Sequence, residues 1–434
     1  MNNKILSLIV ISLLTINFSY SFQTSKAKKF AKSITEKELS EHLYIYASDE
    51  FEGRDTGEPG QKKAVEYLRN YYKSIGIEPG DLEGDYFQEM TLTMRGRRGQ
   101  EPRTVETENV VAIIKGSEKP DEYVVITAHL DHVGVDDKGI YNGADDDGSG
   151  TVALLEIAEA FKKAADKGKG PKRSIVFLHV TGEEKGLLGS AYYADNPIYP
   201  LENTVVNLNV DMIGRIDPSR REKNRDYIYL IGSDHDSVDL HNLSEQTNAE
   251  SVNMTLDYRF NDKNDPNRFY YRSDHYNFAK NGIPIIFYFT GTHADYHKVT
   301  DTPDKIEYDL LEMRSRLIFY TAWNIANREK RLVVDPKPEK VAFEISRDDL
   351  KKFHGVYASD LMPLKFEVYT KSAKLAMNPI GMDQELVLEA TSKNTFKQEI
   401  AGIEVTFEEG TMKLKMQGRE ISFKIVPPET DKEE

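Results

Sequence analysis

The amino-acid sequence predicts an α/β fold with a mostly parallel or mixed central sheet covered by helices on both faces, plus a small antiparallel β domain at the C-terminus. Two observations indicate this fold class. Between residues 109 and 327, apolar runs of strand length alternate with amphipathic stretches of helical length, as in layered α/β domains. Beyond residue 342 only short alternating runs remain, separated by Gly, Asn and Asp, which is typical of antiparallel strands.

The first domain is expected to begin with two helices. Residues 35–48 and 61–75 carry apolar side chains at helical spacing, with a turn-rich segment at 51–57 between them. Buried strands are expected at the apolar runs 110–114, 123–128, 174–180, 205–210, 227–231 and 284–289. Further helices are expected at 151–165, 237–246 and 308–327. Because strands and helices interleave, both faces of the sheet should be covered.

Changes in composition mark the domain boundaries. A proline-punctuated linker at 335–341 separates a first domain at 22–334 from a small β domain at 342–428. Strands of the β domain are expected at 365–369, 385–388, 403–408, 412–416 and 421–425. Residues 429–434 form an acidic tail that we expect to be disordered. A chain of 434 residues suits one large domain and one smaller one.

The composition disfavours some kinds of partner. Hydrophobic residues make up 39% of the chain and charged residues 30%, as in globular proteins. The formal net charge of -15 argues against nucleic acid, which needs a basic binding face. One basic cluster, at Arg95, Arg97, Arg98 and Arg103, lies in a Gly-containing stretch and is interpreted as a solvated loop.

The N-terminus has the pattern of an export signal. Lys4 precedes a mostly apolar stretch, 5–18, that is too short for a typical spanning helix, and Ser19 and Ser21 are small residues before a cleavage site at Phe22. We therefore expect a signal peptide at 1–21 and a periplasmic or extracellular protein without stable membrane insertion. An uncleaved anchor is the alternative. The chain has no cysteine, which leaves no disulfide, thiolate ligand or lipid-attachment cysteine.

Polar residues follow the expected strands in five short segments, 129–131, 143–150, 182–184, 209–211 and 296–302. Open α/β sheets present their functional loops at such places. Together the segments supply the imidazoles and carboxylates that two divalent cations and a water-activating base require. Each segment also has a simpler interpretation, such as an acidic helix N-cap or a hydrated turn. Their joint occurrence in equivalent positions favours a metal site.

Individual residues in these segments suit metal-assisted hydrolysis. His129 ends an apolar strand, and Asp131 could accept its other ring proton and fix its tautomer. Glu183 and Glu184 are adjacent, which suits one for binding a metal and the other for taking a proton from water. Asp211 also ends a strand, where an unpaired carboxylate would be costly without a cation or hydrogen bonds.

These segments resemble the M28 family of zinc peptidases, in particular its aminopeptidase group, over residues 39–327. The resemblance implies that Asp146 bridges two zinc ions and is joined to the next aspartate by a cis peptide bond. It implies that His129 and Asp211 complete the site of one metal, and that Glu184 and His297 complete the other. Manganese or cobalt could substitute for zinc, because the ligand set contains no thiolate.

The resemblance also implies roles in catalysis. Glu183 matches the general base of the family, Asp131 the partner of the metal-binding histidine, and Tyr270 a tyrosine that helps to stabilise the oxyanion. The protease-associated insert of many exported relatives is absent. The eight other histidines are expected to be structural or solvent-facing, although His275 and His293 neighbour the matched segments and could line a pocket. Those eight are His42, His132, His179, His235, His241, His275, His293 and His354.

The sequence therefore predicts an exported dinuclear zinc aminopeptidase that acts on peptides by attack of metal-activated water. A carboxypeptidase or an N-acyl amino acid deacylase is the alternative with the same site. Arg215 could pair with a substrate carboxylate in that case, or form a structural salt bridge. A binding protein with structural metals is the non-enzymatic alternative, and the presence of Glu183 argues against it because a structural site needs no base.

Overall fold

The computed structural model describes residues 26–80, 84–94, 102–336, 343–382, 385–416 and 418–427. The predicted signal peptide, most of the linker and the acidic tail lie outside these residues. The chain forms two compact units, of which the first comprises the described residues of Met1–Met94, Arg103–Asp262 and Arg272–Pro336. The second comprises those of Arg95–Pro102, Lys263–Tyr271 and Lys337–Glu434. Among the described residues, no helix has both the length and the apolar character needed to cross a membrane.

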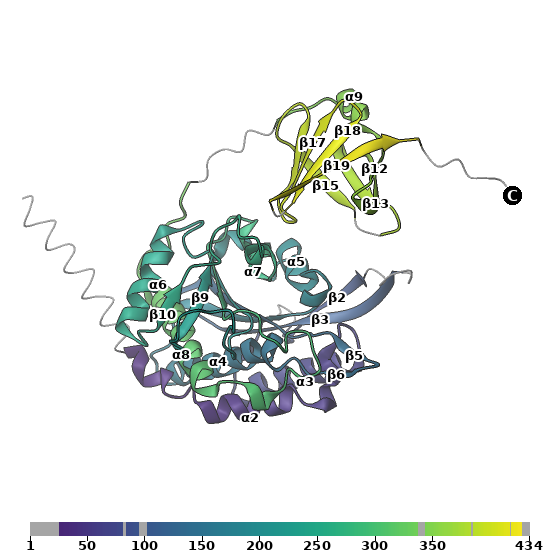
Figure 1. Ribbon diagram of the computed structural model, residues 1–434. Coiled ribbons are helices and arrows are strands. Elements are labelled where there is room, and N and C mark those ends of the chain that lie inside the picture. Colours follow the sequence, from purple (N-terminus) through teal and green to yellow (C-terminus); the bar gives the residue numbers. More distant parts are fainter. Residues whose placement is uncertain are drawn as a thin grey trace, which may run out of the picture. The chain divides into compact units, whose positions relative to one another are not determined.

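A nine-stranded mixed sheet forms the centre of the first unit (Figure 1). The strands run in the order β1-β3-β7-β4-β8-β11-β9-β10, and β2 pairs with β3 beside β1. Their bounds are β1 Glu78–Pro79, β2 Phe87–Met94, β3 Arg103–Ile114, β4 Lys119–His129, β7 Arg173–Val180, β8 Thr204–Val210, β9 Tyr227–Ile231, β10 Thr255–Asp257 and β11 Ile285–Phe289. The sheet contains all six of the apolar runs that were expected to form buried strands.

The middle of the sheet is parallel and its margins are partly antiparallel. β4 pairs in parallel with β7 on one side and with β8 on the other, and β11 is parallel to β8. β7 and β8 are buried along their whole length, as expected for continuous apolar runs covered on both faces. β3 is antiparallel to β7, and β9 is antiparallel to β11. These pairings confirm the mixed sheet of the expected fold class.

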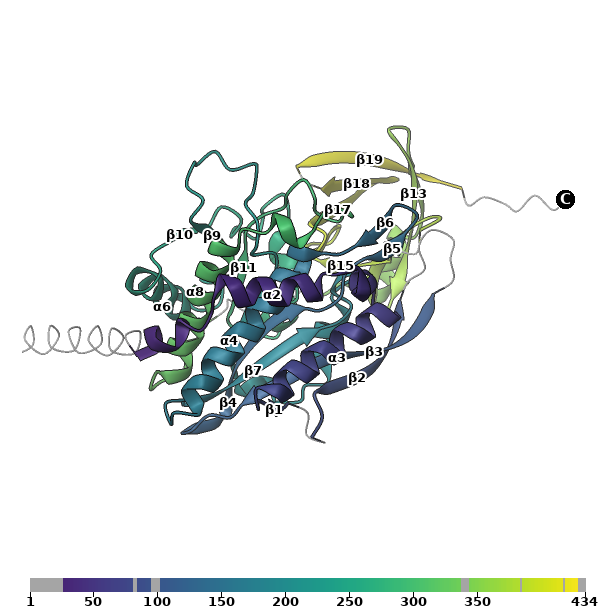
Figure 2. The same ribbon diagram turned by 90° about the horizontal axis from the view of Figure 1, so that it is seen from below.

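Helices cover both faces of this sheet (Figures 1 and 2). One face carries α2, α3, α4 and α8, and the other carries the shorter α5 and α7, which the sequence analysis did not identify. Their bounds are α2 Glu36–Tyr46, α3 Pro59–Ser74, α4 Gly150–Ala165, α5 Leu188–Asp195, α7 His275–Ala279 and α8 Tyr308–Asn327; a further helix, α6, spans Val238–Glu250. α4 is largely buried, and α8 carries the only tryptophan of the chain, Trp323, in the core.

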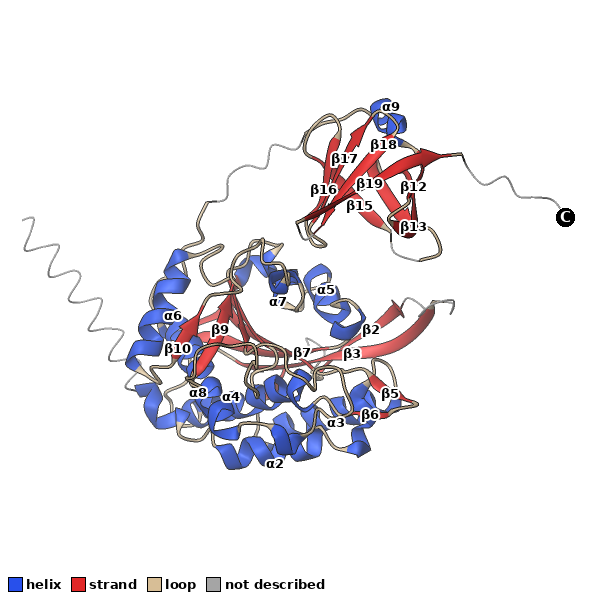
Figure 3. Ribbon diagram, viewed as in Figure 1, coloured by secondary structure: helices blue, strands red, loops and turns tan. Residues whose placement is uncertain are grey.

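The second unit contains a closed antiparallel barrel of eight strands (Figure 3). Each strand pairs with the next, and β12 also pairs with β19, which closes the barrel and leaves no edge strand. The bounds are β12 Gly355–Ser359, β13 Met362–Lys371, β14 Lys374–Pro379, β15 Leu386–Ala390, β16 Thr395–Gln398, β17 Ile403–Glu408, β18 Thr411–Met416 and β19 Arg419–Val426. Phe396, Val405, Met412 and Phe423 fill its interior, and three of the strands, β12, β14 and β16, were not expected.

Candidate metal centre

The register of the parallel strands brings the predicted segments together. Thr127 of β4 pairs with Asn209 of β8, so His129 and Asp211, each two residues further on, lie at the same level of neighbouring strands. On the other side of β4, His129 pairs with the last residue of β7, Val180. The short η3 turn, Glu183–Lys185, therefore begins just beyond this level. Residues far apart in the sequence thus meet at the carboxyl edge of the sheet, as strand topology predicts.

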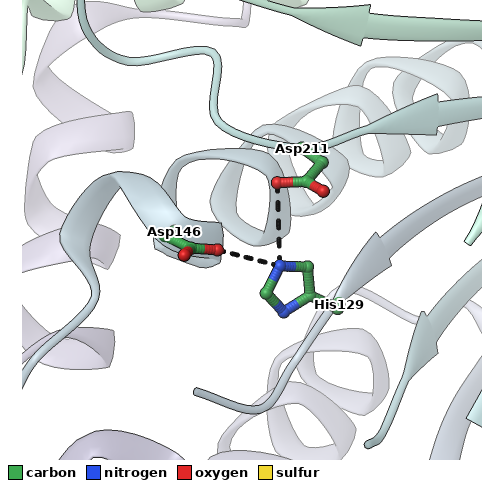
Figure 4. A group of neighbouring side chains, drawn as sticks. All are labelled: His129, Asp146 and Asp211. Carbon is green, nitrogen blue, oxygen red and sulfur yellow. Dashed lines mark ion pairs between the residues drawn. The ribbon is translucent and has the colours of Figure 1, made fainter. Parts of the chain in front are cut away.

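One group of side chains consists of His129, Asp146 and Asp211 (Figure 4). His129 Nε2 lies 3.1 Å from Asp146 Oδ1 and 3.6 Å from Asp211 Oδ1. All three side chains are buried, and the carboxylates point at the same ring nitrogen. Tetrahedral zinc holds nitrogen and oxygen ligands at 2.0–2.1 Å, which places the ligand atoms roughly 3.3 Å apart. The spacing of the group fits one such ion.

A second group uses the other oxygen of Asp146. His297 Nε2 lies 2.9 Å from Asp146 Oδ2 and 3.1 Å from Glu184 Oε1. Asp146 therefore presents Oδ1 to one group and Oδ2 to the other, which is the arrangement of a carboxylate that bridges two cations. Asp146 Oδ2, Glu184 Oε1 and His297 Nε2 are buried, and although they lie close together, none has a hydrogen-bond partner of good geometry among the described residues. Such unpaired atoms fit a cation at this second group, because a cation would satisfy them.

Backbone donors hold the aspartate-rich segment in place. Asp147 Oδ1 accepts hydrogen bonds from the backbone N–H groups of Gly150 (2.9 Å) and Met212 (3.1 Å), and Asp147 Oδ2 accepts one from His129 (3.1 Å). Asp147 thus ties the ends of β4 and β8 to the start of α4. Asp301 Oδ2 accepts the N–H group of Asp146 at 3.3 Å. The peptide bond between Asp146 and Asp147 is cis, as the family resemblance implies.

Asp131 connects the segment of His129 with that of Glu183. Its carboxylate accepts hydrogen bonds from the backbone N–H group of Glu183 (3.0 Å) and from Thr56 Oγ1 (2.9 Å). His129 Nδ1 lies 3.0 Å from the backbone oxygen of Asp131, closer than the carboxylate, whose Oδ1 is 3.9 Å away. The backbone carbonyl therefore takes the contact that the sequence analysis gave to the carboxylate, whose two oxygens are turned toward Glu183 and Thr56.

Glu183 belongs to neither ligand group, although it lies next to Glu184 in the same turn. Burial raises the pKa of Glu183 well above its usual range, the charge of His129 opposes this rise, and the charge of Glu184 adds to it. A carboxylate with a raised pKa is a better proton acceptor and donor near neutral pH than an ordinary glutamate. Glu183 is therefore suited to move a proton beside the two groups.

The ligand groups are strongly coupled electrostatically. Burial alone would raise the pKa of Asp146, but contacts with His129 and His297 hold it well below its usual range. Burial and the charge of Asp146 oppose ionisation of Glu184, yet contacts with His132 and His297 lower its pKa to about 2. Burial disfavours the charged form of His297, whereas the carboxylates of Asp146 and Glu184 raise its pKa to about 10. Ionised carboxylates at a buried place attract positive charge, in keeping with a cation site.

His132 is the residue that the sequence analysis missed. It was expected to be structural or solvent-facing, but it is fully buried and forms a possible metal-binding group with Asp146 and Glu184. Its Nδ1 lies 2.9 Å from Glu184 Oε1 and 3.8 Å from Asp146 Oδ2. The only signal in the sequence is its position directly after Asp131, three residues beyond His129 at the end of β4.

The other residues considered from the sequence have structural contacts. Arg215 donates to Asp295 Oδ2 at 3.0 Å, which confirms the structural salt bridge. The buried ring of His275 stacks on Phe287, and His293 Nε2 lies 3.2 Å from Asp145 Oδ2.

Tyr270 lies in the second compact unit. Its ring packs edge-on against Tyr271, and the ammonium group of Lys263 lies 5.2 Å from the ring centroid. The role of Tyr270 as an oxyanion donor stays a prediction.

Comparison with known proteins places this centre in a family. The model of peptidase family M28 matches residues 109–322, the segment that contains both ligand groups. This part of the chain belongs to peptidase family M28. A protein described as a probable zinc metalloprotease of Pyrenophora teres f. teres is 28% identical over 52% of this chain and 53% of its own length. A probable glutamate carboxypeptidase of Arabidopsis thaliana is 33% identical over 32% of this chain and 18% of its own length.

Solved structures of aminopeptidases share the fold of most of this chain. The LapA aminopeptidase of Legionella pneumophila matches with a TM-score of 0.53 and 20% identity, over 70% of this chain and 75% of that one. An aminopeptidase from Aneurinibacillus sp. strain AM-1 matches with a TM-score of 0.53 and 17% identity, over 72% of this chain and 98% of that one. The alignments with the first curated relatives span about half the length of those proteins.

Proposed function

We propose that this chain is a dinuclear zinc peptidase that releases amino acids from the N-termini of peptides. The observation that carries the proposal is the division of the two oxygens of Asp146 between two ligand groups, with Glu183 beside both and part of neither. Membership of peptidase family M28 and the aminopeptidases among its structural neighbours support it. Manganese and cobalt are possible substitutes for zinc, since all the ligands are nitrogen or oxygen atoms.

The residues of the chain have distinct tasks in this hydrolysis. When bound, two divalent cations supply Lewis acidity that polarises the scissile carbonyl and acidifies the attacking water. Glu183 takes the proton of that water and passes it to the leaving amine. The hydrogen bond from the Glu183 backbone to Asp131 fixes the turn that carries this base relative to His129. Tyr270 is proposed to donate a hydrogen bond to the oxyanion.

A carboxypeptidase is the second candidate, because one relative is described as a probable glutamate carboxypeptidase. Such an enzyme needs a cation for the terminal carboxylate of its substrate. Arg215, the residue considered for that role, is engaged by Asp295, which weakens the carboxypeptidase interpretation. A free amino terminus, by contrast, could be bound by the carboxylates of the centre itself, which favours the aminopeptidase.

Export is part of the proposal and rests on the N-terminal sequence pattern of residues 1–21. We propose that the mature chain acts on peptides in the periplasm or outside the cell. N-terminal sequencing of the protein from the periplasmic or culture fraction should give Phe22 as the first residue. Recovery of the uncleaved chain from membranes would instead support an anchor.

Peptides with free and blocked termini test the activity itself. Purified zinc-loaded protein should release the N-terminal residue from peptides with a free amino group, including those amidated at the C-terminus. N-acetylated peptides should resist cleavage, and a chelator should abolish release. Cleavage confined to peptides with a free C-terminal carboxylate would identify a carboxypeptidase, and release from N-acyl amino acids a deacylase. A protein that binds zinc but cleaves none of these would support a structural role for the metals.

A further inference from the structure

We propose that His132 is a direct ligand of the metal ion that Glu184 and His297 bind, so that this ion has four protein donors. The inference rests on the proposed function only in assuming that the two ligand groups bind metal. It adds an imidazole to the set that the family resemblance implies, and it makes the two metal sites unequal.

The spacing of the donor atoms supports direct binding. Around the second group, His132 Nδ1 lies 2.9 Å from Glu184 Oε1 and 3.8 Å from Asp146 Oδ2. His297 Nε2 lies 2.9 Å from the same Asp146 oxygen and 3.1 Å from the same Glu184 oxygen. These separations lie on both sides of the roughly 3.3 Å expected between tetrahedral ligands that are 2.0–2.1 Å from zinc. Both imidazoles therefore approach the same pair of carboxylate oxygens.

The ring of His132 is held in this position by its surroundings. Its backbone N–H group donates to the Arg54 carbonyl oxygen at 3.2 Å. Gly143 adopts a left-handed conformation with φ of 55°, and a Cβ atom there would lie 2.6 Å from ring atoms of His132. Only glycine leaves room for the imidazole at this point. The packing thus keeps the ring next to the aspartate-rich segment and its Nδ1 toward the carboxylates.

The hydrogen bonding of His132 is incomplete without a cation. Both ring nitrogens are buried and have no hydrogen-bond partner of good geometry in the described part of the chain. Buried polar groups in folded proteins almost always have a partner, so an unpaired one usually has a role. A cation bound to Nδ1, together with Asp146 and Glu184, would satisfy that nitrogen.

The two sites then differ in their coordination. The ion near His129 has three protein donors, from His129, Asp146 and Asp211, and keeps a position for water or substrate. The other ion has four, the number typical of closed structural zinc sites. The side chain of His297 is 37% exposed, whereas that of His132 is fully buried, so His132 supplies a shielded ligand that His297 does not. We therefore expect the site with His132 to bind zinc first and more tightly.

The competing interpretation is that Nδ1–H of His132 donates a hydrogen bond to Glu184 and does not touch the metal. His132→Asn separates the two possibilities, because the asparagine amide can keep an N–H group near the position of Nδ1 but is a poor zinc ligand. His297→Gln serves as the reference for loss of a ligand from the same ion. His293→Asn serves as the matched control, since His293 is a buried imidazole beside Asp145 and lies outside both ligand groups.

Equilibrium competition with a chromophoric chelator measures zinc affinity in the full-length variants. Removing a residue that only hydrogen-bonds to a ligand typically costs 10–100-fold in metal affinity. We expect His132→Asn and His297→Gln each to lower the affinity for the more tightly bound zinc ion by more than 100-fold. His293→Asn should lower this affinity by less than 10-fold. A loss below 100-fold in His132→Asn would overturn the assignment. Fluorescence of Trp323 in metal-free protein checks that each variant is folded.

X-ray absorption of the unmodified protein gives an answer that needs no variant. With one equivalent of zinc bound, the spectrum should fit two imidazoles for His132 and His297. An average of one imidazole per zinc with both sites filled would show that His132 is not a ligand, because each site would then have a single histidine; three imidazoles over two zinc ions would support it even if the first equivalent occupied the His129 site. Failure of the protein to bind two zinc ions would refute the proposed function, whereas two ions with one imidazole each would refute only the role of His132.

Discussion

Replacement of Asp147 by asparagine should destabilise the first unit, because no orientation of an amide satisfies the donors that surround this side chain. Its carboxylate accepts three backbone N–H groups, two at Oδ1 and one at Oδ2, at 2.9–3.1 Å. If the amide oxygen takes the place of Oδ1, its NH2 group faces the N–H of His129. One buried donor is then left unpaired, and the other two hydrogen bonds lose the contribution of the charge.

The magnitude follows from these contacts. An unpaired buried donor costs about 1–3 kcal/mol, and each remaining bond loses roughly 1 kcal/mol when its acceptor becomes neutral. Burial, and then the charge of Asp211, raise the pKa of Asp147, so ionisation itself has a cost that asparagine avoids. We therefore expect the free energy of unfolding to fall by about 3 kcal/mol, the low end of the range that these contributions give together. Asp136→Asn, at an exposed carboxylate that accepts hydrogen bonds from the Lys138 N–H group and from Tyr141 Oη, is the charge control and should shift the urea midpoint far less than Asp147→Asn.

Trp323 fluorescence during urea unfolding of the metal-free protein provides the assay. Trp323 is the only tryptophan and is buried in α8, so its signal reports on the first unit without a contribution from the barrel. Urea slopes of small proteins reach about 3 kcal/mol/M and rise with size, so the midpoint of Asp147→Asn should fall by about 1 M or slightly less. A midpoint within about 0.2 M of the unmodified protein would show that the three hydrogen bonds do not stabilise this segment.

Three further predictions follow from other parts of the structure. Asp146→Asn should lower the zinc content at both sites, because Asp146 presents one oxygen to each group; two tightly bound ions in this variant would identify a different bridging residue. A chain ending at Pro336 keeps the contacts of Asp335 with Val238 and Asp236. It should therefore hydrolyse small amino-acid amides at close to the full-length rate. A soluble, metal-loaded truncation without activity would make the β domain part of the active site. Burial lowers the pKa of His179 to about 3, so as pH falls below about 6.5 the unfolded state takes up a proton at this residue before the folded state does. Near pH 4.5 the free energy of unfolding should therefore fall by about 2–3 kcal/mol, a loss that His179→Gln should not show. Equal acid sensitivity of the two proteins in urea titrations would contradict this.

The sequence predicts the strands at the centre of the sheet better than the strands of the barrel. Residues 174–180 were expected as a strand and β7 is Arg173–Val180, because a strand buried on both faces needs a continuous apolar run. The barrel was harder to predict. Its strands are short and half-exposed, and its closure depends on the pairing of Val356 with Val426, which no local pattern encodes.

Two of the ligands were accessible to sequence reasoning because they lie at the carboxyl ends of strands in the parallel centre, where His129 ends β4 and Asp211 directly follows β8. His129 and Asp211 are placed by strand register alone. His132 was not accessible, because the direction of its ring depends on the turn after β4 and on the space left by Gly143. The contact of His129 Nδ1 with the Asp131 carbonyl depends likewise on the donors that Thr56 and Glu183 direct at the carboxylate.

The activity and metal content of Glu183→Gln show whether Glu183 acts as the base beside the two metal sites. Glu183 is in neither ligand group, and the backbone N–H group that it donates to Asp131 survives the substitution. We expect two zinc ions to remain bound while turnover of an N-terminal amino-acid amide falls by at least the ~10²–10⁴-fold typical of general acid–base residues. Turnover close to that of the unmodified protein, with full zinc content, would contradict the account, because the two-metal centre would then work without this base.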